Sequence, residues 1–303
     1  MKSQTIQNGY DYILDDETGT FKAISRSTGE ITEAVQHILP YGTKCYTPES
    51  QRLYKERKEQ ERKHNIRRLK EKELGNFYFT SRKEDFTDIS PESLTRLIYL
   101  NTFIAYGNRV MLTERTPMHH RDLSGVLKLS KATITRFWKE VSPKYIKETD
   151  EGLILSNDVI FRRGAIKEGD SYQRMYIKGI RSLYESTDKC NHKYLGFLFR
   201  LLPFVNIEYN VVCSNPFEKD LERVELISIA DFCNMIGYDK AHINKLIRIY
   251  QNIKFDIGEK LERFCSFTYD GISRQNAKIF INPHILYCGS DYTKVEVLGA
   301  FCK

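Results

Sequence analysis

The stretch KLSKATITRFWKEV, residues 128–141, places apolar side chains at three- and four-residue intervals, which predicts an amphipathic helix. Ser130 can cap the start of this helix, because its hydroxyl can accept a hydrogen bond from a backbone amide of the first turn. The apolar face, expected to point inward, consists of Ile134, Phe137, Trp138 and Val141. The opposite face carries Lys131, Thr133, Thr135, Arg136 and Lys139.

The segments around this helix predict a definite order of elements. An apolar helix starts at Ser90 and stops at Gly107, a short strand and a second helix follow, and the runs KYIKE and GLILSNDVIFRRG form a hairpin after residue 141. This is the order of a winged helix-turn-helix domain, whose third helix lies in the DNA major groove and whose hairpin contacts the backbone. Thr133, Thr135 and Arg136 are short or forked polar side chains that suit base edges or phosphates. Winged helices also dock proteins, however, and a polar helix face can simply be solvated.

The same order recurs further along the chain, which indicates an internal repeat. NHKYLGFLFRLLPFVN predicts a helix, EYNVVCSNP a strand, ISIADFCNMIGYDKAHINKLIRIYQNI two helices with a turn, and NAKIFINPHILYCG a strand-like wing. Asn244 suits adenine, and Arg248 suits guanine or a phosphate. Alternatively, the second copy is a degenerate dimerisation domain, because its insert FEKDLERVE is acidic and would repel phosphate. The outward-facing candidates are Lys240, His242, Asn244, Lys245 and Arg248.

Two further segments carry basic residues. Residues 51–72 contain ten Lys or Arg against four Glu, a balance of +6 in a chain whose net charge is +7. They predict a basic helix that is either a solvated linker or a phosphate-contacting arm, with Arg67 and Arg68 as candidate contacts. Arg162 and Arg163, at the end of the first predicted hairpin, are candidates as well.

The expected fold class is α+β, mainly helical, with tandem winged helix-turn-helix domains. The turn formers DETG and RSTG punctuate strand-like runs near the start of the chain and predict a small β-hairpin there. The predicted divisions are an N-terminal β unit over residues 1–50, a basic helical linker over 51–76, a first winged-helix domain over 77–166, a helical connector over 167–185 and a second winged-helix domain over 186–303.

Several functional classes are disfavoured by the sequence. His119 and His120 are adjacent and would diverge on a helix, so they do not match the paired histidines of a metal-dependent nicking enzyme. Phosphate-cradling glycine loops are absent, and the seven cysteines include no CxxC pair. We therefore expect no catalytic residues, no metal and no cofactor. Without an apolar run of roughly 18 residues or a secretory signal, we expect a cytoplasmic protein of a bacterial host cell.

Three stretches carry a resemblance to a known family. YQRMYIKGIRSLYE, YLGFLFRLLPFVNIEYNVVCSNP and KIFINPHILYCG resemble winged-helix replication proteins of Firmicute plasmids and phages. They are also similar to regulatory proteins of Bacillus-type phages and mobile elements, and the doubled plan is similar to that of iteron-binding plasmid initiators. The resemblance covers roughly residues 170–303, and the N-terminal β unit and the basic helix depart from it. It implies origin binding and recruitment of host replication proteins.

These patterns together predict a non-enzymatic, sequence-specific double-stranded DNA-binding protein of a phage or plasmid that acts in replication initiation. One alternative is a phage transcriptional regulator that uses the same winged helices. Another is a protein-docking factor without DNA binding. The expected partners are double-stranded DNA, host replication or transcription proteins and a second copy of the chain in a homodimer, with no membrane.

Overall fold

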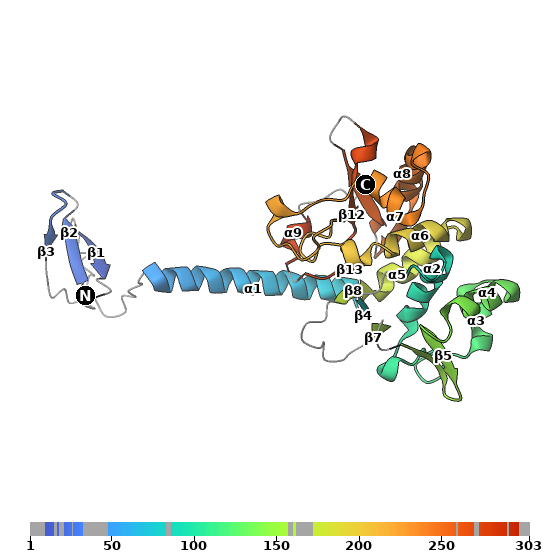
Figure 1. Ribbon diagram of the computed structural model, residues 1–303. Helices are drawn as coiled ribbons and strands as arrows, with labels where there is room; N and C mark the ends of the chain where they lie inside the picture. Colours follow the sequence, from blue (N-terminus) through green and yellow to red (C-terminus); the bar gives the residue numbers. More distant parts are fainter. Residues whose placement is uncertain are drawn as a thin grey trace. The chain divides into compact units, whose positions relative to one another are not determined.

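The computed structural model describes residues 10–14, 17, 21–25, 27–32, 48–82, 86–156, 160–161, 172–258, 260–269, 273–289 and 291–296 (Figure 1). The chain divides into two compact units, Met1–Arg62 and Lys63–Lys303. The described strands pair in small antiparallel sheets and alternate with helices, so the predicted α+β class is confirmed. None of the helices in the described ranges is long and apolar enough to cross a membrane.

The first unit contains a three-stranded antiparallel sheet in the order β1 (Tyr10–Leu14), β2 (Phe21–Ser25) and β3 (Ile31–Thr32). Gly29 lies in the turn between β2 and β3 with φ +71°, a conformation that glycine adopts without steric cost. The described strands therefore extend the predicted hairpin by one strand. The predicted basic helix is α1 (Pro48–Leu74), which begins in this unit and ends in the second.

A four-stranded antiparallel sheet, in the order β13-β8-β4-β7, is central to the second unit. Its strands are β4 (Phe77–Ser81), β7 (Ile160–Phe161), β8 (Tyr172–Tyr176) and β13 (Leu286–Tyr287). The prediction of a helical connector over 167–185 is wrong in part, because β8 precedes helix α5 (Ile177–Ser186) there. Pairing with β4 on one edge and β13 on the other holds this segment extended, which shows tertiary pairing overriding local propensity.

The first motif, residues 91–155, has its elements in the predicted order. Ser90 caps its first helix by accepting a hydrogen bond from the amide of Ser93, and the residues after this helix form two 3-10 turns rather than a continuation to Gly107. Isolated bridges pair Ile104 with Val110 and Arg109 with Ile154, so a short extended segment joins the hairpin. The elements are α2 (Pro91–Leu100), η1 (Asn101–Phe103), η2 (Tyr106–Asn108), η3 (His120–Asp122), α3 (Leu123–Leu127), α4 (Lys131–Val141), β5 (Ile146–Thr149) and β6 (Gly152–Leu155).

The second motif, residues 192–281, repeats this order and adds to it. A bridge between Val211 and Phe280 joins its extended segment to its last strand, as in the first motif. The addition is a hairpin, β9 paired with β10, between the last helix and the closing strands. The elements are α6 (His192–Phe199), η5 (Leu202–Phe204), η6 (Leu221–Arg223), α7 (Ile229–Ile236), η7 (Lys240–His242), α8 (Ile243–Asn252), β9 (Lys254–Ile257), β10 (Lys260–Arg263), β11 (Cys265–Thr268), η8 (Arg274–Asn276) and β12 (Lys278–Ile281). The 3-10 turn η4 (Lys189–Asn191) and the short helix α9 (Thr293–Glu296) flank it.

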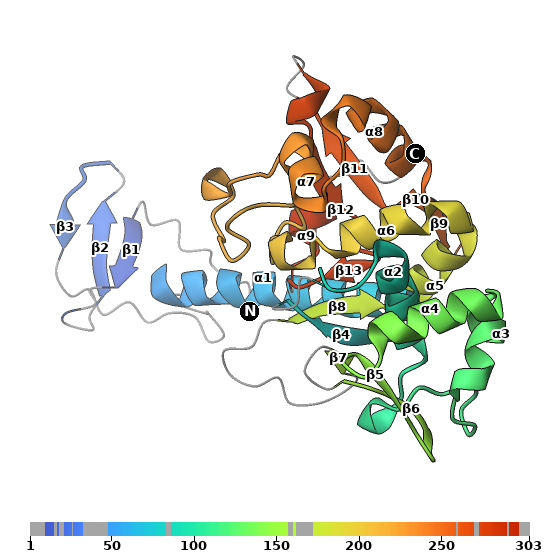
Figure 2. The same cartoon turned by 45° about the vertical axis from the view of Figure 1, so that its right-hand side comes forward.

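The two motifs meet where α2 crosses α6. The Thr95 hydroxyl donates to the carbonyl of His192 at 2.7 Å, and a Cβ added at Gly196 would stand 1.9 Å from the Pro91 carbonyl oxygen. Buried side chains from both motifs belong to one hydrophobic cluster. Figures 1 and 2 show the α2–α6 pair between α4 on one side and α8 on the other. The two motifs therefore share a core within one compact unit.

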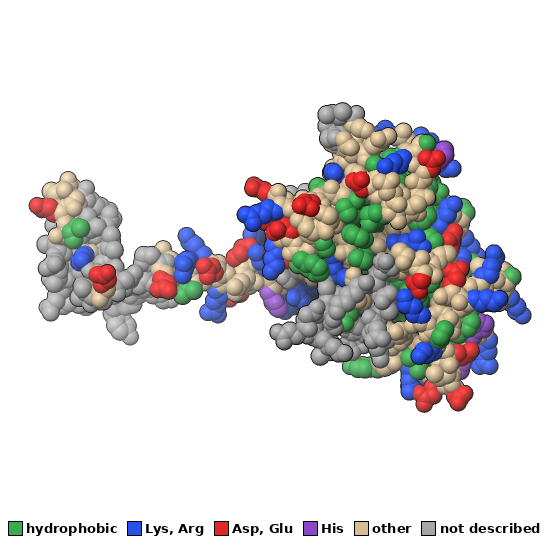
Figure 3. All heavy atoms as spheres, viewed as in Figure 1, with side chains coloured by type: hydrophobic (Ala, Val, Ile, Leu, Met, Phe, Trp, Pro, Cys, Tyr) green, Lys and Arg blue, Asp and Glu red, His purple; other side chains and the backbone are tan. Residues whose placement is uncertain are grey.

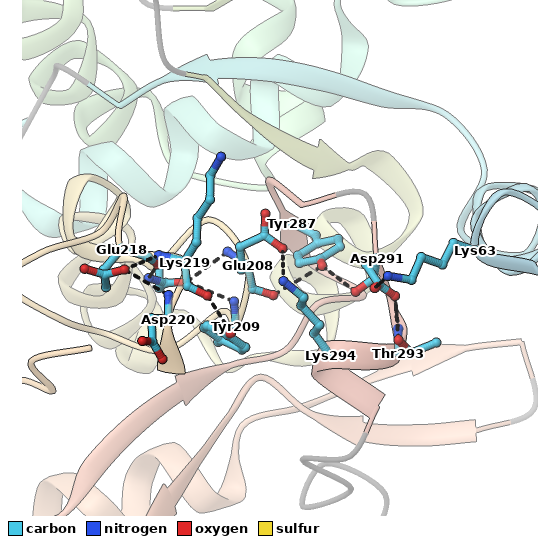
Figure 4. A network of polar contacts seen from close by, with 11 residues as sticks. Lys63, Glu208, Tyr209, Glu218, Lys219, Asp220, Tyr287, Asp291, Thr293 and Lys294 are labelled. Atoms are coloured by element: carbon cyan, nitrogen blue, oxygen red, sulfur yellow. Dashed lines mark hydrogen bonds and ion pairs between the residues drawn. The ribbon is translucent and has the colours of Figure 1, made fainter. Parts of the chain in front are cut away.

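The end of α1 within the second unit is held mainly by charged groups. Lys63 pairs with the buried Asp291 at 2.9 Å, and Figure 4 shows this pair beside the hydroxyl of Thr293, which donates to the same carboxylate. The Glu71 carboxylate accepts from the Arg174 guanidinium at 3.2 Å. Leu74, the last residue of α1, is fully buried and adds an apolar side chain to these charged contacts.

Candidate nucleic-acid interface

Helix α4 has the cap and the inner face that the sequence predicts. The Ser130 hydroxyl accepts from the Thr133 amide, and Lys128 adopts φ +54° in the turn before it. The side chains that are buried on its inner face are Ile134, Phe137 and Val141. Trp138 is the exception, because it lies at the edge of this face, half-buried, with its ring edge-on to the His120 ring at 4.7 Å.

The outer face of α4 is cationic. Lys131, Arg136 and Lys139 are exposed, as is Thr135. The Thr135 hydroxyl donates to the Lys131 carbonyl at 3.0 Å, and the half-buried Thr133 hydroxyl lies 2.9 Å from the Ser130 hydroxyl. The two threonines therefore support the helix itself, and the long cations are the groups best placed to reach a ligand.

Arg96 on α2 lies behind this face and was missed by sequence reasoning, because α2 reads as a core helix. Burial lowers its pKa, and the neighbouring Arg136 charge acts in the same direction. Its Nε is buried without a hydrogen-bond partner among the described residues. Nearby, Glu140 accepts from the amide and hydroxyl of Ser90 at 2.8 and 2.7 Å, which ties α4 to the start of α2.

Helix α8 presents the corresponding surface of the second motif. Asp239 caps the turn before it by accepting from the Ala241 amide at 2.9 Å, and Gly237 ends α7 with φ +67°. Its inner face is buried as predicted and consists of Ile243, Leu246, Ile247 and Tyr250. The residues predicted to face outward are all exposed: Lys240, His242, Asn244, Lys245 and Arg248.

Arg274 also belongs to the surface of α8, although sequence reasoning did not select it. It begins η8, the turn between β11 and β12, and its Nη1 lies 3.5 Å from Oδ1 of Asn244. The signal that could have found it is the stretch YDGISRQNAK, a turn with two cations between strand-like runs. Its place next to Asn244 depends on how the hairpin folds back, which the sequence pattern does not specify.

The hairpin β5–β6 of the first motif has an acidic tip. The tip of β5–β6 carries the exposed carboxylates of Glu148, Asp150 and Glu151. Glu148 accepts from the amide of His120 at 2.9 Å, and Glu151 pairs with Arg109. An acidic tip is repelled by phosphate, so the first hairpin is poorly suited to the backbone contact predicted for it.

The acidic insert, residues 217–225, lies away from the outer face of α8. It is held by residues 206–215, since Asn206 donates to the Glu218 carbonyl at 2.8 Å and the Tyr209 hydroxyl donates to the Lys219 carbonyl at 2.7 Å. In both Figure 1 and Figure 2 the golden turn η6 stands on the other side of the second motif from α8. Its charge therefore does not oppose an anion on α8.

The remaining candidates do not join either helix surface. Glu71 accepts a hydrogen bond from Arg67 at 2.8 Å, and this bond raises the pKa of Arg67. Arg68 is exposed on the same helix, which ends beside β4 and β8, apart from α4 and α8 (Figures 1 and 2). Arg162 and Arg163 lie outside the described residues. The structure thus forms two separate candidate surfaces, on α4 and on α8.

Charge on the visible face of the molecule is mixed. Figure 3 shows Lys and Arg side chains interspersed with Asp and Glu rather than gathered into one patch. The described ranges contain no group of three His, Cys, Asp or Glu side chains arranged to hold a metal ion. Comparison of the chain with protein-family models, with curated proteins and with solved structures found no match.

Proposed function

We propose that both motifs are winged helix-turn-helix domains and that the chain is a non-enzymatic, sequence-specific double-stranded DNA-binding protein of a phage or plasmid. The observation that carries this proposal is that α4 and α8 share one construction at corresponding positions. Each follows a left-handed turn residue and a capped first turn, buries one face and exposes several cations on the other. This is how a recognition helix presents itself to the major groove.

The arrangement of the motifs supports a bipartite DNA site read by one chain. The strands that precede and follow each motif pair with each other, β4 with β7 and β8 with β13, and the central pair β4–β8 is antiparallel. An antiparallel pair relates the two motifs by an approximate twofold, the symmetry that DNA half-sites also have. Because the outer residues of α4 and α8 differ, the two half-sites should differ in sequence. Tethering the two readers raises the affinity for a long site.

A role in replication initiation rests on the resemblance of residues 170–303 to plasmid and phage initiators. The test is to select genomic fragments with the purified full-length chain at near-physiological salt and to sequence those that bind. Direct repeats near the element's own replication gene would support an initiator. Enrichment at promoters would instead favour a transcriptional regulator, and no enrichment with a folded protein would overturn the proposal.

A mutational test separates the two surfaces. The double variant Arg136→Ala, Lys139→Ala should weaken binding and lose protection in one half of the footprint, and Arg248→Ala should lose protection in the other half. Each lost base contact should cost about 1–3 kcal/mol, and each lost phosphate contact should lower the salt slope by about one. Lys260→Ala, at an exposed position at the start of β10, is the control and should bind like wild type. Unchanged affinity of the folded double variant would refute the assignment of α4.

A specific observation favours a second candidate function, protein docking. The acidic tip of β5–β6 is unsuited to phosphate, and the insert exposes Phe217 and Leu221 to 59% and 58%. Exposed large apolar side chains beside carboxylates suit a basic protein surface. A docking factor would show no salt-dependent DNA affinity, whereas the DNA-binding function predicts a steep fall of affinity with salt.

A further inference from the structure

The turn between β11 and β12 is anchored to its own helix-turn-helix. Ala277, directly after η8, is fully buried, and its carbonyl accepts from the amide of Ile229 at the start of α7 at 2.8 Å. The Ser273 hydroxyl caps η8 by accepting from the Gln275 amide at 3.2 Å. Arg274 therefore starts from a fixed backbone, and its guanidinium reaches Asn244 on the outer face of α8.

The pairing of these two side chains has one allowed polarity. A guanidinium only donates hydrogen bonds, so Arg274 can bond the oxygen of the Asn244 amide and not its nitrogen. The 3.5 Å separation from Nη1 to Oδ1 is longer than the about 2.7–3.2 Å of an ordinary N–H···O hydrogen bond, so this is a weak contact between two exposed side chains. The oxygen keeps a second lone pair, and the amide nitrogen keeps both of its protons. An asparagine held in this way presents one acceptor and one donor side by side, which is the pattern that adenine matches with its N6 amino group and N7.

We propose that Arg274 is a positioning residue that determines the base preference of Asn244, and this rests on the proposed role of α8 in DNA recognition. By holding the oxygen of the amide, Arg274 selects the orientation that reads adenine. Without it, an exposed asparagine rotates between orientations and loses discrimination. The second motif then reads DNA with a helix and a turn that act together.

Among its described residues, the first motif has no side-chain pair that corresponds to Arg274 and Asn244. Aligning Lys131 with Lys240 places Thr135 opposite Asn244, and the Thr135 hydroxyl is bonded to the Lys131 carbonyl. The hairpin of the first motif carries Asp150 and Glu151 at its tip instead of a cation. The effect that we assign to Arg274, on the base preference of Asn244, therefore concerns only the half of the DNA site that α8 reads.

The test measures dissociation constants of the full-length chain by fluorescence anisotropy. The duplexes carry the selected site with each of the four bases at every position of the α8 half. The variants are Asn244→Ala, Arg274→Ala, their combination and Arg274→Lys. Gln275→Ala, the neighbouring exposed residue of the same turn, is the matched control for folding and should bind like wild type.

We expect Asn244→Ala and Arg274→Ala to reduce discrimination at the same base pair by roughly ten- to a hundredfold. The double variant should lose little more than either single variant, because the two residues act as one unit. Arg274→Lys keeps the charge but not the planar fork. Its ammonium also only donates hydrogen bonds, so it can still bond the Asn244 oxygen, and it should keep more of the discrimination than Arg274→Ala does. A phosphate contact would instead leave discrimination unchanged in both variants.

Other outcomes would overturn the inference. If Arg274→Ala weakens all duplexes equally and lowers the salt slope by about one, Arg274 contacts phosphate and does not position Asn244. If it changes nothing, or if its effect adds fully to that of Asn244→Ala, the two residues are independent. If the wild-type chain shows no sequence preference at all, the proposed function fails and the inference fails with it, which is a different result from a wild-type preference that survives Arg274→Ala.

Discussion

Single residues hold the junction of the two motifs, and His192 is the clearest case. It is 3% exposed, and its Nε2 lies 3.1 and 3.0 Å from the carbonyl oxygens of Tyr184 and Thr187, so a proton on Nε2 is shared between them. Its ring lies 4.4 Å from the Tyr184 ring, which in turn stacks on Tyr99. Burial lowers the pKa of His192 from its ordinary value of 6.5 and outweighs the hydrogen bonds that raise it.

This burial predicts a pH dependence of stability. Well above pH 6.5 the imidazole is neutral in both states. As the pH falls below 6.5, the unfolded chain binds a proton that the folded chain does not, so the free energy of unfolding decreases down to the folded-state pKa. His192→Gln keeps an N–H donor but does not titrate. It should reduce the slope of the free energy of unfolding against pH by up to the equivalent of one bound proton. Urea denaturation between pH 8 and pH 5 measures it, and equal slopes for variant and wild type would contradict the prediction.

At the scale of elements, helix start signals in the sequence are reliable. Ser90, Ser130 and Ser228 all cap the helices that follow them, because an N-cap is a local interaction within four residues. Helix contacts are not local. The crossing of α2 over α6 depends on Gly196, where the Pro91 backbone occupies the space of a side chain. A glycine in an apolar helix does not reveal which partner approaches it.

The contact between α2 and α6 at Gly196 can be tested by comparing this glycine with Gly125 in α3. Gly196→Ala should destabilise the chain by about 1–3 kcal/mol or more, because the methyl group can be accommodated only if α2 and α6 separate. Gly125→Ala in α3 has open space around the added Cβ and should be neutral or stabilising by about 0.5–1 kcal/mol. Chemical denaturation of both variants gives the comparison. Equal stability of the two would mean that the helices do not depend on this contact.

At the scale of the whole molecule, residues 63–303 form one compact unit although they contain two repeated motifs. The sheet β13-β8-β4-β7 takes strands from before and after each motif, and the central pair runs from Phe77 opposite Tyr176 to Ser81 opposite Tyr172. Arg174, in the middle of this sheet and nearly buried, donates to the carbonyls of Tyr287 and Cys288. The segments that flank the two motifs are therefore joined in one sheet, and buried side chains of both motifs belong to one hydrophobic cluster.

We therefore expect the two motifs to unfold together. Trp138, the only tryptophan of the chain, reports on the first motif through its fluorescence. Hydrogen exchange of the amides of α8 reports on the second. Both signals should share one denaturation midpoint, because coincident transitions are the mark of a cooperative unit. A clear separation of the midpoints would show that the motifs are independent domains joined by a weak contact.

The sequence by itself determined the local features of this protein. It predicted the helices of both motifs, the caps at Ser90 and Ser130 in the first motif, the buried face of α8 and the exposed cations of α4, since periodicity and capping act over only a few residues. Only the tertiary structure decided that β8 is a strand, that Trp138 is half-buried, that the acidic insert lies away from α8 and that Arg274 lies beside Asn244. Each of these depends on contacts between segments far apart in the chain, and side-chain patterns do not encode which distant segments will meet.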